Sequence, residues 1–123
     1  MAYRLLVVDD SETIRKVLGK SLSLSGLNLE SVLFASDGRE ALGVLEREWV
    51  DLVLTDLNMP VLTGKQMIEA MAEHPIWRSI PVIVVSSNPP KTFNNKRVMG
   101  CLTKPFFPEK INAAVLQALG AQT

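Results

Sequence analysis

The sequence predicts an α/β domain built on a parallel β-sheet, and three observations lead to this expectation. Short apolar runs recur along the chain, as expected for strands that are buried on both faces of a parallel sheet. Stretches with helical spacing of apolar residues alternate with these runs, which is typical of βα repeats. The 123 residues, 47% of them hydrophobic, suit one compact domain with a buried core. We therefore expect a single domain over residues 1–123.

The first βα unit is expected near the N-terminus. The apolar run from Tyr3 to Val8 predicts the first strand. Ser11 then predicts the start of a helix with Glu12 in its first turn, because a serine side chain can accept a backbone N–H of that turn. The apolar residues of this helix are Ile14, Val17, Leu18, Leu22 and Leu24.

The next two strands are predicted at Ser31 to Ala35 and at Asp51 to Thr55. Asp37 follows the first of these as a possible helix cap. Asn58 and Pro60 follow the other strand and predict a loop rich in turns, which Gly64 extends. The apolar residues expected on the inner faces of the two helices are Ala41, Leu42, Leu45, Met67, Ile68 and Met71.

The last two strands are joined by an unusual connection. Pro81 is expected to start the fourth strand, whose β-branched run extends from Val82 to Val85. The segment from Ser86 to Met99 contains two consecutive prolines, so its helix, expected around Lys91 to Val98, should be short or distorted. The fifth strand covers about Gly100 to Thr103, and Cys101 within it is expected to be a small buried residue. The final helix is expected from about Pro108, with Ile111, Ala114, Val115, Leu116 and Leu119 on its apolar side.

Charge and hydropathy exclude several classes of function. The chain has 13 basic and 13 acidic residues, and this zero net charge gives no general attraction to nucleic acid or to an anionic membrane. No apolar stretch approaches the roughly 20 residues needed to cross a bilayer, and the N-terminal run is too short for a signal peptide. We therefore expect a cytoplasmic protein that binds neither nucleic acid directly nor a membrane.

Polar side chains follow four of the expected strands: Asp9 with Asp10, then Asp56, Ser86 and Lys104. The carboxyl ends of parallel strands share one edge of the sheet, so we expect these side chains to meet there. Neighbouring carboxylates repel one another, and a bound cation relieves the repulsion. Oxygen ligands without a histidine or cysteine cluster favour Mg²⁺, with Mn²⁺ as a second possibility.

A magnesium site of this kind points to phosphoryl chemistry, because Mg²⁺ commonly shares its ligand shell with a phosphate. A carboxylate can receive a phosphoryl group as an acyl phosphate. Asp56 is the candidate acceptor, Lys104 can neutralise the phosphoryl oxygens, and Ser86 can donate a hydrogen bond to them.

Four motifs occur along the chain in the order VVDDS, DLVLTDLNMP, PVIVVSS and TKPF. With these motifs the chain resembles a response-regulator receiver domain of two-component signalling over essentially its whole length. The resemblance implies a sheet of five strands in the order 2-1-3-4-5, doubly wound with helices on both faces. It also implies a phosphoprotein that receives its phosphoryl group from a histidine kinase or phosphotransfer protein and signals to a downstream protein target.

The resemblance assigns a role to each residue of the expected site. Asp56 is the phosphoacceptor, Ser86 the switch hydroxyl, and Lys104 the partner of the phosphoryl oxygens. The ligands implied for Mg²⁺ are Asp9, Asp10, Asp56 and the backbone carbonyl of Asn58. The bond between Lys104 and Pro105 is a candidate cis peptide. No other cofactor is expected.

Two alternatives remain open beside this interpretation. A degenerate receiver would act only through protein contacts, and two departures from the family pattern suit it. Cys101 stands where an aromatic residue is usual, and the proline-containing segment after Ser86 is shortened. A magnesium-dependent phosphatase would also use acidic residues, but it would require an acid two positions after the nucleophile, where this chain has Asn58. In the leading interpretation the chain assists its own phosphorylation and is not an enzyme with an external turnover substrate.

Overall fold

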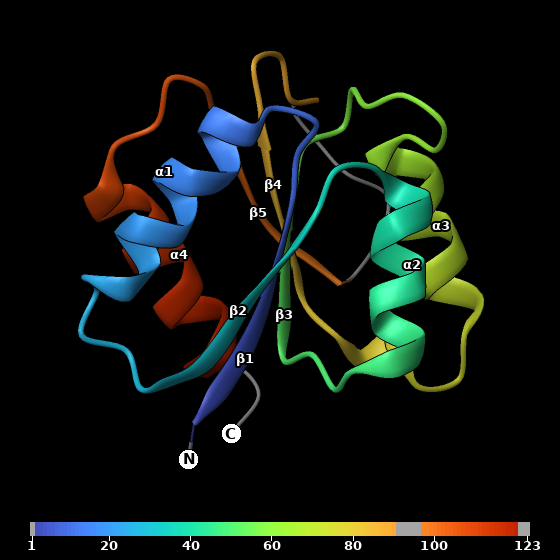
Figure 1. Cartoon of the computed structure of the whole chain (residues 1–123), viewed down its shortest axis with the longest axis horizontal. Helices are drawn as coiled ribbons and strands as arrows, with labels where there is room; N and C mark the ends of the chain where they lie inside the picture. The colour runs from blue at the N-terminus through green and yellow to red at the C-terminus, as the bar shows by residue number, and fades with distance from the viewer. Residues whose placement is uncertain (1, 91–96, 121–123) are drawn as a thin grey trace.

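The computed structural model describes residues 2–90 and 97–120. Its elements are β1 (Tyr3–Val8), α1 (Glu12–Ser23), β2 (Leu29–Ala35), α2 (Gly38–Arg47), β3 (Leu52–Thr55), α3 (Gly64–Glu73), the short 3₁₀ helix η1 (Trp77–Ser79), β4 (Val82–Ser86), β5 (Val98–Thr103) and α4 (Pro108–Gly120). The strands form one parallel sheet in the order β2-β1-β3-β4-β5. Helices α1 and α4 cover one face, and α2 and α3 cover the other (Figure 1). The predicted doubly wound α/β fold is confirmed.

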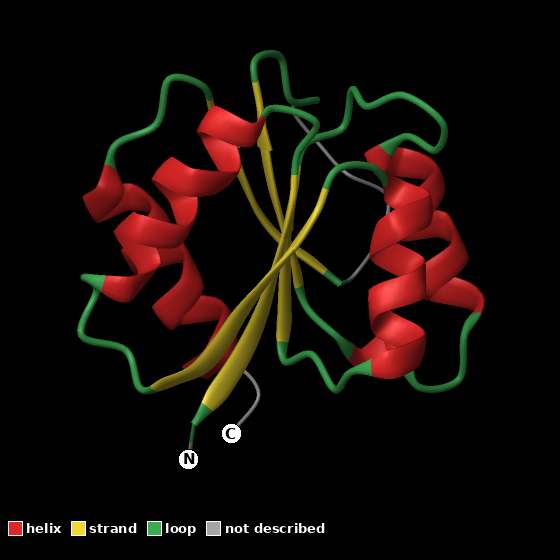
Figure 2. Cartoon of the chain, in the orientation of Figure 1, coloured by secondary structure: helices red, strands yellow, loops and turns green. Residues whose placement is uncertain are grey.

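The sheet separates two apolar cores (Figure 2). Successive residues of a strand point to opposite faces, so Leu6 and Val8 of β1 pack toward α2 and α3, whereas Leu5 and Val7 pack toward α1 and α4. The four residues of β3 are all buried, as are those of β4. This burial on both faces explains why the central strands appear in the sequence as continuous apolar runs.

Several element boundaries differ from the prediction. β2 and β5 each begin two residues earlier than expected, because Leu29 and Val98 already pair with the neighbouring strand. The predicted short fourth helix falls mainly on residues 91–96, which lie outside the described residues. The turn η1 was not predicted; it follows His74, whose Nδ1 accepts the backbone N–H groups of Ile76 (3.1 Å) and Trp77 (3.2 Å).

Two predictions of burial are wrong, because Cys101 and Leu116 are exposed. The apolar residues Val17 and Leu24 near α1 are also exposed. Leu18 and Leu22 occupy the buried stripe of α1, and a helix of this kind buries only one stripe. Cys101 lies on the edge strand β5 beside Leu102, which packs toward α1 and α4. The thiol therefore points to the opposite face at the rim of the sheet.

The helices begin with the capping interactions that the sequence suggested. Ser11 Oγ accepts the Ile14 N–H (3.2 Å), and Asp37 Oδ1 accepts the Glu40 N–H (2.8 Å). Helix α3 begins with a capping box that was not predicted, in which Thr63 and Gln66 exchange side-chain and backbone hydrogen bonds. Among the described helices, none is both long and apolar enough to cross a membrane.

The end of the loop between β3 and α3 lies very close to its beginning, at Asp56 and Leu57. Gly64 donates its N–H to Leu57 O (3.0 Å), and a Cβ atom on Gly64 would lie 2.0 Å from Asp56 O. The same loop is joined to α2, because Gly38 donates its N–H to Leu62 O (2.9 Å). Val61 in this loop has a φ of 68°, a strained value for a β-branched residue. The loop geometry is therefore fixed from both sides.

We expect Gly64→Ala to lower the free energy of unfolding by about 3 kcal/mol, because the new methyl group would overlap a backbone oxygen that has no room to move. Gly43→Ala is the matched control, since a Cβ there meets only the end of the Arg47 side chain at 3.5 Å. The control should raise stability by about 0.5–1 kcal/mol, as expected for glycine replaced within a helix. Urea unfolding followed by circular dichroism measures both, and equal effects of the two substitutions would contradict the close approach.

Candidate functional site

The carboxyl edge of the sheet holds four polar residues: Asp9, Asp56, Ser86 and Lys104. Asp9, Asp56 and Lys104 each follow directly after a strand. The backbone N–H of each donates one further hydrogen bond to the end of the neighbouring strand. These bonds run from Asp9 N to Ala35 O (3.1 Å), from Asp56 N to Val8 O (3.0 Å) and from Lys104 N to Ser86 O (2.9 Å). The backbone of the site is therefore part of the sheet, and the side chains start from rigid positions.

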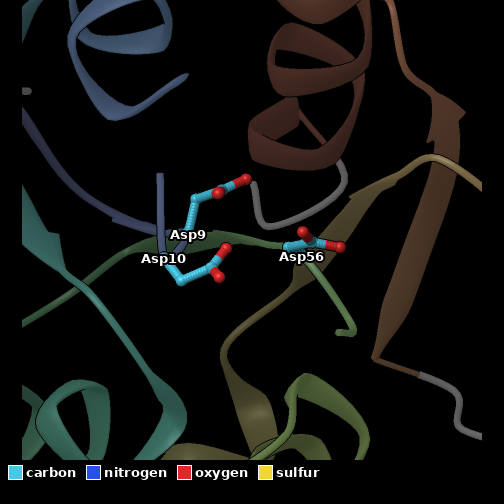
Figure 3. A group of neighbouring side chains, drawn as sticks. All are labelled: Asp9, Asp10 and Asp56. Atoms are coloured by element: carbon cyan, nitrogen blue, oxygen red, sulfur yellow. The ribbon is translucent and has the colours of Figure 1, made fainter. Parts of the chain in front are cut away.

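Three carboxylates gather at this edge. One oxygen each of Asp9, Asp10 and Asp56 lies within 4.8 Å of the others. Figure 3 shows Asp9 and Asp10 at the end of β1 beside Asp56 from the end of β3. Asp9 and Asp56 are buried, whereas Asp10 is exposed. Two of the three charges are thus withdrawn from water, which raises the cost of leaving them without a counter-charge.

Lys104 supplies a counter-charge to both buried acids. Its Nζ lies 2.7 Å from Asp9 Oδ2 and 3.0 Å from Asp56 Oδ2. Burial by itself would lower the pKa of the Lys104 ammonium, but the hydrogen bonds and charges of Asp9 and Asp56 outweigh it and raise the pKa above the ordinary lysine value. The lysine is therefore held in its charged form between the two acids.

Backbone N–H groups hold the other oxygen of each buried acid. Asp9 Oδ1 accepts the Ser11 N–H (2.9 Å) at the start of α1. Asp56 Oδ1 accepts the Leu57 N–H (2.7 Å) and, at 3.4 Å, the Asn58 N–H. These bonds fix both carboxylates in orientation. The side chain of Asp10 makes no hydrogen bond or ion pair with any residue in 2–90 or 97–120, which leaves it able to turn toward a ligand.

The structure links Ser86 and Asn58 to this cluster through their backbones. Ser86 is fully buried at the end of β4, its carbonyl accepts the Lys104 N–H, and its Oγ accepts the Asn88 N–H at 3.4 Å. Asn58 is joined to the site by its N–H, and the ligand role of its carbonyl oxygen remains a prediction. The peptide bond between Lys104 and Pro105 is cis, as predicted.

Two supporting residues were not predicted from the sequence. The Arg15 guanidinium donates to Asp9 O (2.7 Å), and the Thr55 hydroxyl donates to Asp56 O (2.7 Å). Arg15 lies one turn after the helix cap Ser11, and that spacing could have indicated a side chain able to reach the end of β1. Thr55 was placed in a strand, where nothing in the sequence distinguishes its hydroxyl.

The donor set suits a hard divalent cation. It consists of carboxylate oxygens, and within residues 2–90 and 97–120 no histidine or cysteine joins the cluster. Mg²⁺ is typically held by one or two carboxylates and keeps several waters, so it does not require a closed cage. One exposed and two buried carboxylates on one rim satisfy this requirement and leave space on the solvent side.

Comparison with known proteins gives a consistent result. A family model described as the response regulator receiver domain matches residues 5–116. The alkaline phosphatase synthesis transcriptional regulatory protein PhoP of Bacillus subtilis is 33% identical, and the match covers 94% of this chain. The chain spans about half (48%) of that relative. It spans 92% of a chemotaxis protein CheY homolog of Campylobacter jejuni, which is 31% identical over 95% of this chain.

Solved structures are similar over nearly the whole chain. The chemotaxis response regulator CheY4 of Vibrio cholerae superposes with a TM-score of 0.81 at 28% identity, covering 96% of this chain and 99% of that one. The signal receiver domain of an HD domain-containing protein from Pseudomonas fluorescens superposes with a TM-score of 0.87 at 26% identity. That match covers 99% of this chain and 98% of the other. The five-stranded arrangement of this chain is thus shared by proteins of related sequence.

The raised pKa of Lys104 predicts a specific loss of stability at alkaline pH. A folded-state pKa above the unfolded value of about 10.4 stabilises the fold below that pH, and the contribution is lost as the pH rises through the folded-state pKa. The gap in unfolding free energy between wild type and Lys104→Met should therefore be constant near pH 8 and narrow above about pH 10.4.

Lys65→Met is the matched control, because Lys65 is exposed on α3. The difference in unfolding free energy between wild type and Lys65→Met should not narrow above about pH 10.4. Urea titrations at a series of pH values measure all three proteins, and parallel curves for wild type and Lys104→Met would contradict the coupling of Lys104 to the two acids.

Proposed function

Because this chain belongs to the response regulator receiver domain family, we propose that it is a phosphorylation-dependent signalling switch with Asp56 as its phosphoacceptor. The observation that carries this proposal is the position of the Lys104 ammonium, 3.0 Å from Asp56 and 2.7 Å from Asp9. A cation fixed at that place can neutralise charge on a group transferred to Asp56. An isolated carboxylate at a strand end would have no such support.

We propose Mg²⁺ as the metal of the site, with Mn²⁺ able to replace it. Its ligands would be Asp9, Asp10, Asp56 and the backbone carbonyl of Asn58. When bound, the metal neutralises phosphoryl oxygens and the negative charge of the acids around them. The cluster of three carboxylates supports this assignment.

In the proposed transfer an oxygen of the Asp56 carboxylate attacks phosphorus of a phosphohistidine on the donor. The new P–O bond forms as the P–N bond breaks, and the departing imidazole takes up a proton. Lys104 neutralises the transferred oxygens, and the Ser86 hydroxyl donates a hydrogen bond to one of them. Attack of water on phosphorus later releases inorganic phosphate and restores the carboxylate. The chain therefore cycles between two states without turning over an external substrate.

We propose a histidine kinase or phosphotransfer protein as the donor and a downstream protein as the target. Zero net charge supports output through protein contact rather than direct binding of nucleic acid. We further propose that residues 1–123 form a single receiver domain acting in the cytoplasm. The two relatives described above bear the names of a transcriptional regulatory protein and a chemotaxis protein, so receivers of similar sequence serve different outputs.

Incubation with Mg²⁺ and a small phosphodonor such as acetyl phosphate tests the phosphoacceptor. Intact-mass spectrometry should detect one phosphoryl adduct on the wild type and none on Asp56→Asn, because an amide is a poor nucleophile for phosphorus. Asp37→Asn is the matched control, since asparagine caps a helix about as well as aspartate. This control should be labelled like the wild type.

The same experiment distinguishes the two alternatives. Absence of an adduct under conditions that label a known receiver would favour a degenerate receiver that acts through contacts alone. Rapid turnover of a panel of phosphoesters would favour a phosphatase. An adduct that persists on Asp56→Asn would place the acceptor elsewhere and contradict the proposal.

Metal binding can be tested separately through stability. A ligand that binds only the folded state adds RT ln(1 + [L]/Kd), so Mg²⁺ at ten times its Kd should add about 1.4 kcal/mol to the unfolding free energy. Asp10→Asn should lose most of this gain and still fold, because Asp10 is exposed and makes no described contact. Asp37→Asn should keep the gain. Equal stabilisation of Asp10→Asn and wild type, at matched ionic strength, would remove Asp10 from the ligand set.

A further inference from the structure

A pocket of about 420 Å³ lies at the amino edge of the sheet, opposite to the edge that holds Asp56. Its walls come from residues 45–50, where α2 ends, and from the segment around η1, which follows the end of α3. Figure 1 shows that α2 and α3 run in the same direction, so both end on this side of the molecule. Small-ligand sites typically have volumes of roughly 300–1,000 Å³. None of the residues proposed for metal or phosphoryl binding lines this pocket, so it is a separate site.

Both tryptophans of the chain, Trp49 and Trp77, line the pocket. Trp49 is 59% exposed, and its indole N–H donates to Asp51 Oδ1 (3.0 Å). Asp51 is fixed in turn, because its Oδ2 accepts the backbone N–H of Arg4 (2.8 Å). An exposed indole that is already held in one orientation loses little entropy when a ligand binds to it. Trp49 is therefore a preformed aromatic wall.

The Trp77 side of the pocket is fixed by stacking. The rings of His74 and Trp77 lie with their centroids 3.8 Å apart and an angle of 10° between their planes. Because His74 Nδ1 accepts the N–H groups of Ile76 and Trp77, the neutral ring carries its proton on Nε2. No acceptor for the Nε2–H occurs among residues 2–90 and 97–120. Ile76, which also lines the pocket, is 55% exposed. An apolar surface and an available donor thus belong to the same wall.

The charges around the pocket favour a cationic ligand. Glu46 lines it, and its carboxylate makes no ion pair or hydrogen bond within the described part of the chain. Glu48 is already paired with Arg4. The Arg47 guanidinium runs back along α2, where it would meet a Cβ atom on Gly43 at 3.5 Å. The C-terminal ends of α2 and α3 add partial negative charge, and α3 has no basic residue in its last turn.

We propose that this pocket binds an arginine side chain of a partner polypeptide. A guanidinium is planar and weakly hydrated, so it stacks on an aromatic face such as that of Trp49 more readily than an ammonium does. Its N–H groups can donate to the Glu46 carboxylate. The His74 Nε2–H matches a main-chain carbonyl beside the arginine, and Ile76 offers an apolar contact to the neighbouring residues. These last two features favour an arginine within a polypeptide over a free guanidinium compound.

The indole N–H signals in a proton–nitrogen correlation NMR spectrum report on this pocket, because the chain has no tryptophan other than the two that line it. The full chain is titrated with a blocked glycine–arginine–glycine tripeptide up to about 50 mM at constant ionic strength, which covers the range of weak binding. Both indole signals should shift with one common Kd. The citrulline analogue, in which a neutral urea replaces the guanidinium, should bind at least about fivefold more weakly, because it lacks the cation–π contact.

Two substitutions test the contacts separately. Trp49→Leu removes the aromatic wall and should weaken binding of the arginine tripeptide at least about fivefold, as followed by the Trp77 indole signal. Glu46→Gln removes the charge and should weaken it about threefold. Phe107→Leu and Glu69→Gln are the matched controls, because both residues are exposed and neither lines the pocket. Both controls should bind like the wild type, and circular dichroism verifies that all four variants are folded.

The proposal is overturned if the arginine tripeptide leaves the indole signals unchanged, if the citrulline analogue binds equally well, or if either Trp49→Leu or Glu46→Gln binds like the wild type. Agmatine, which carries a guanidinium without peptide groups, distinguishes the source of the ligand. Agmatine that binds as tightly as the tripeptide would overturn the assignment to a polypeptide and indicate a small guanidinium compound. None of these results bears on phosphorylation of Asp56, which the intact-mass experiment tests independently.

Discussion

The ammonium of Lys104 between Asp9 and Asp56 is the interaction on which the carboxyl edge of the sheet depends. Two buried carboxylates beside each other would destabilise the fold, and the single positive charge of Lys104, 2.7 and 3.0 Å from them, offsets part of their charge. The same arrangement leaves Asp10 in solvent, with its charge free. An edge built this way pairs both buried acids with one cation and keeps a third, exposed carboxylate at the same rim.

The strand order explains how one lysine reaches two acids. In the sheet β4 lies between β3, which precedes Asp56, and β5, which precedes Lys104. The Lys104 side chain therefore passes the end of β4, where the residue is Ser86. A serine is small enough to leave this path open, and its backbone carbonyl accepts the Lys104 N–H. The strand order and the small side chain of Ser86 thus both allow Lys104 to reach Asp56.

Much of this architecture could be predicted, because its causes are local. A β-branched run predicts a strand from its own residues, as at Val82 to Val85. A helix start can be predicted from its cap, as at Ser11 and Asp37. The residue types at the strand ends indicate the chemistry. Other features depend on tertiary distances. Helical spacing alone does not tell whether Val17 or Leu18 faces the sheet, and edge position rather than hydrophobicity decides the exposure of Cys101. The contact of Arg15 with the Asp9 carbonyl likewise arises only when α1 packs against β1.

The ion pairs of Lys104 join residues 95 and 48 positions apart in the chain. Synthesis proceeds from the N-terminus, so β1 and β3 with their acids leave the ribosome well before the strand that brings the lysine. Until then a partly folded sheet carries acidic groups without a counter-charge at its edge. The ion pairs of Lys104 with the two acids therefore form only when the last strand joins the sheet. A chain that is interrupted before β5 has the Asp56 carboxylate but lacks the lysine that pairs with it.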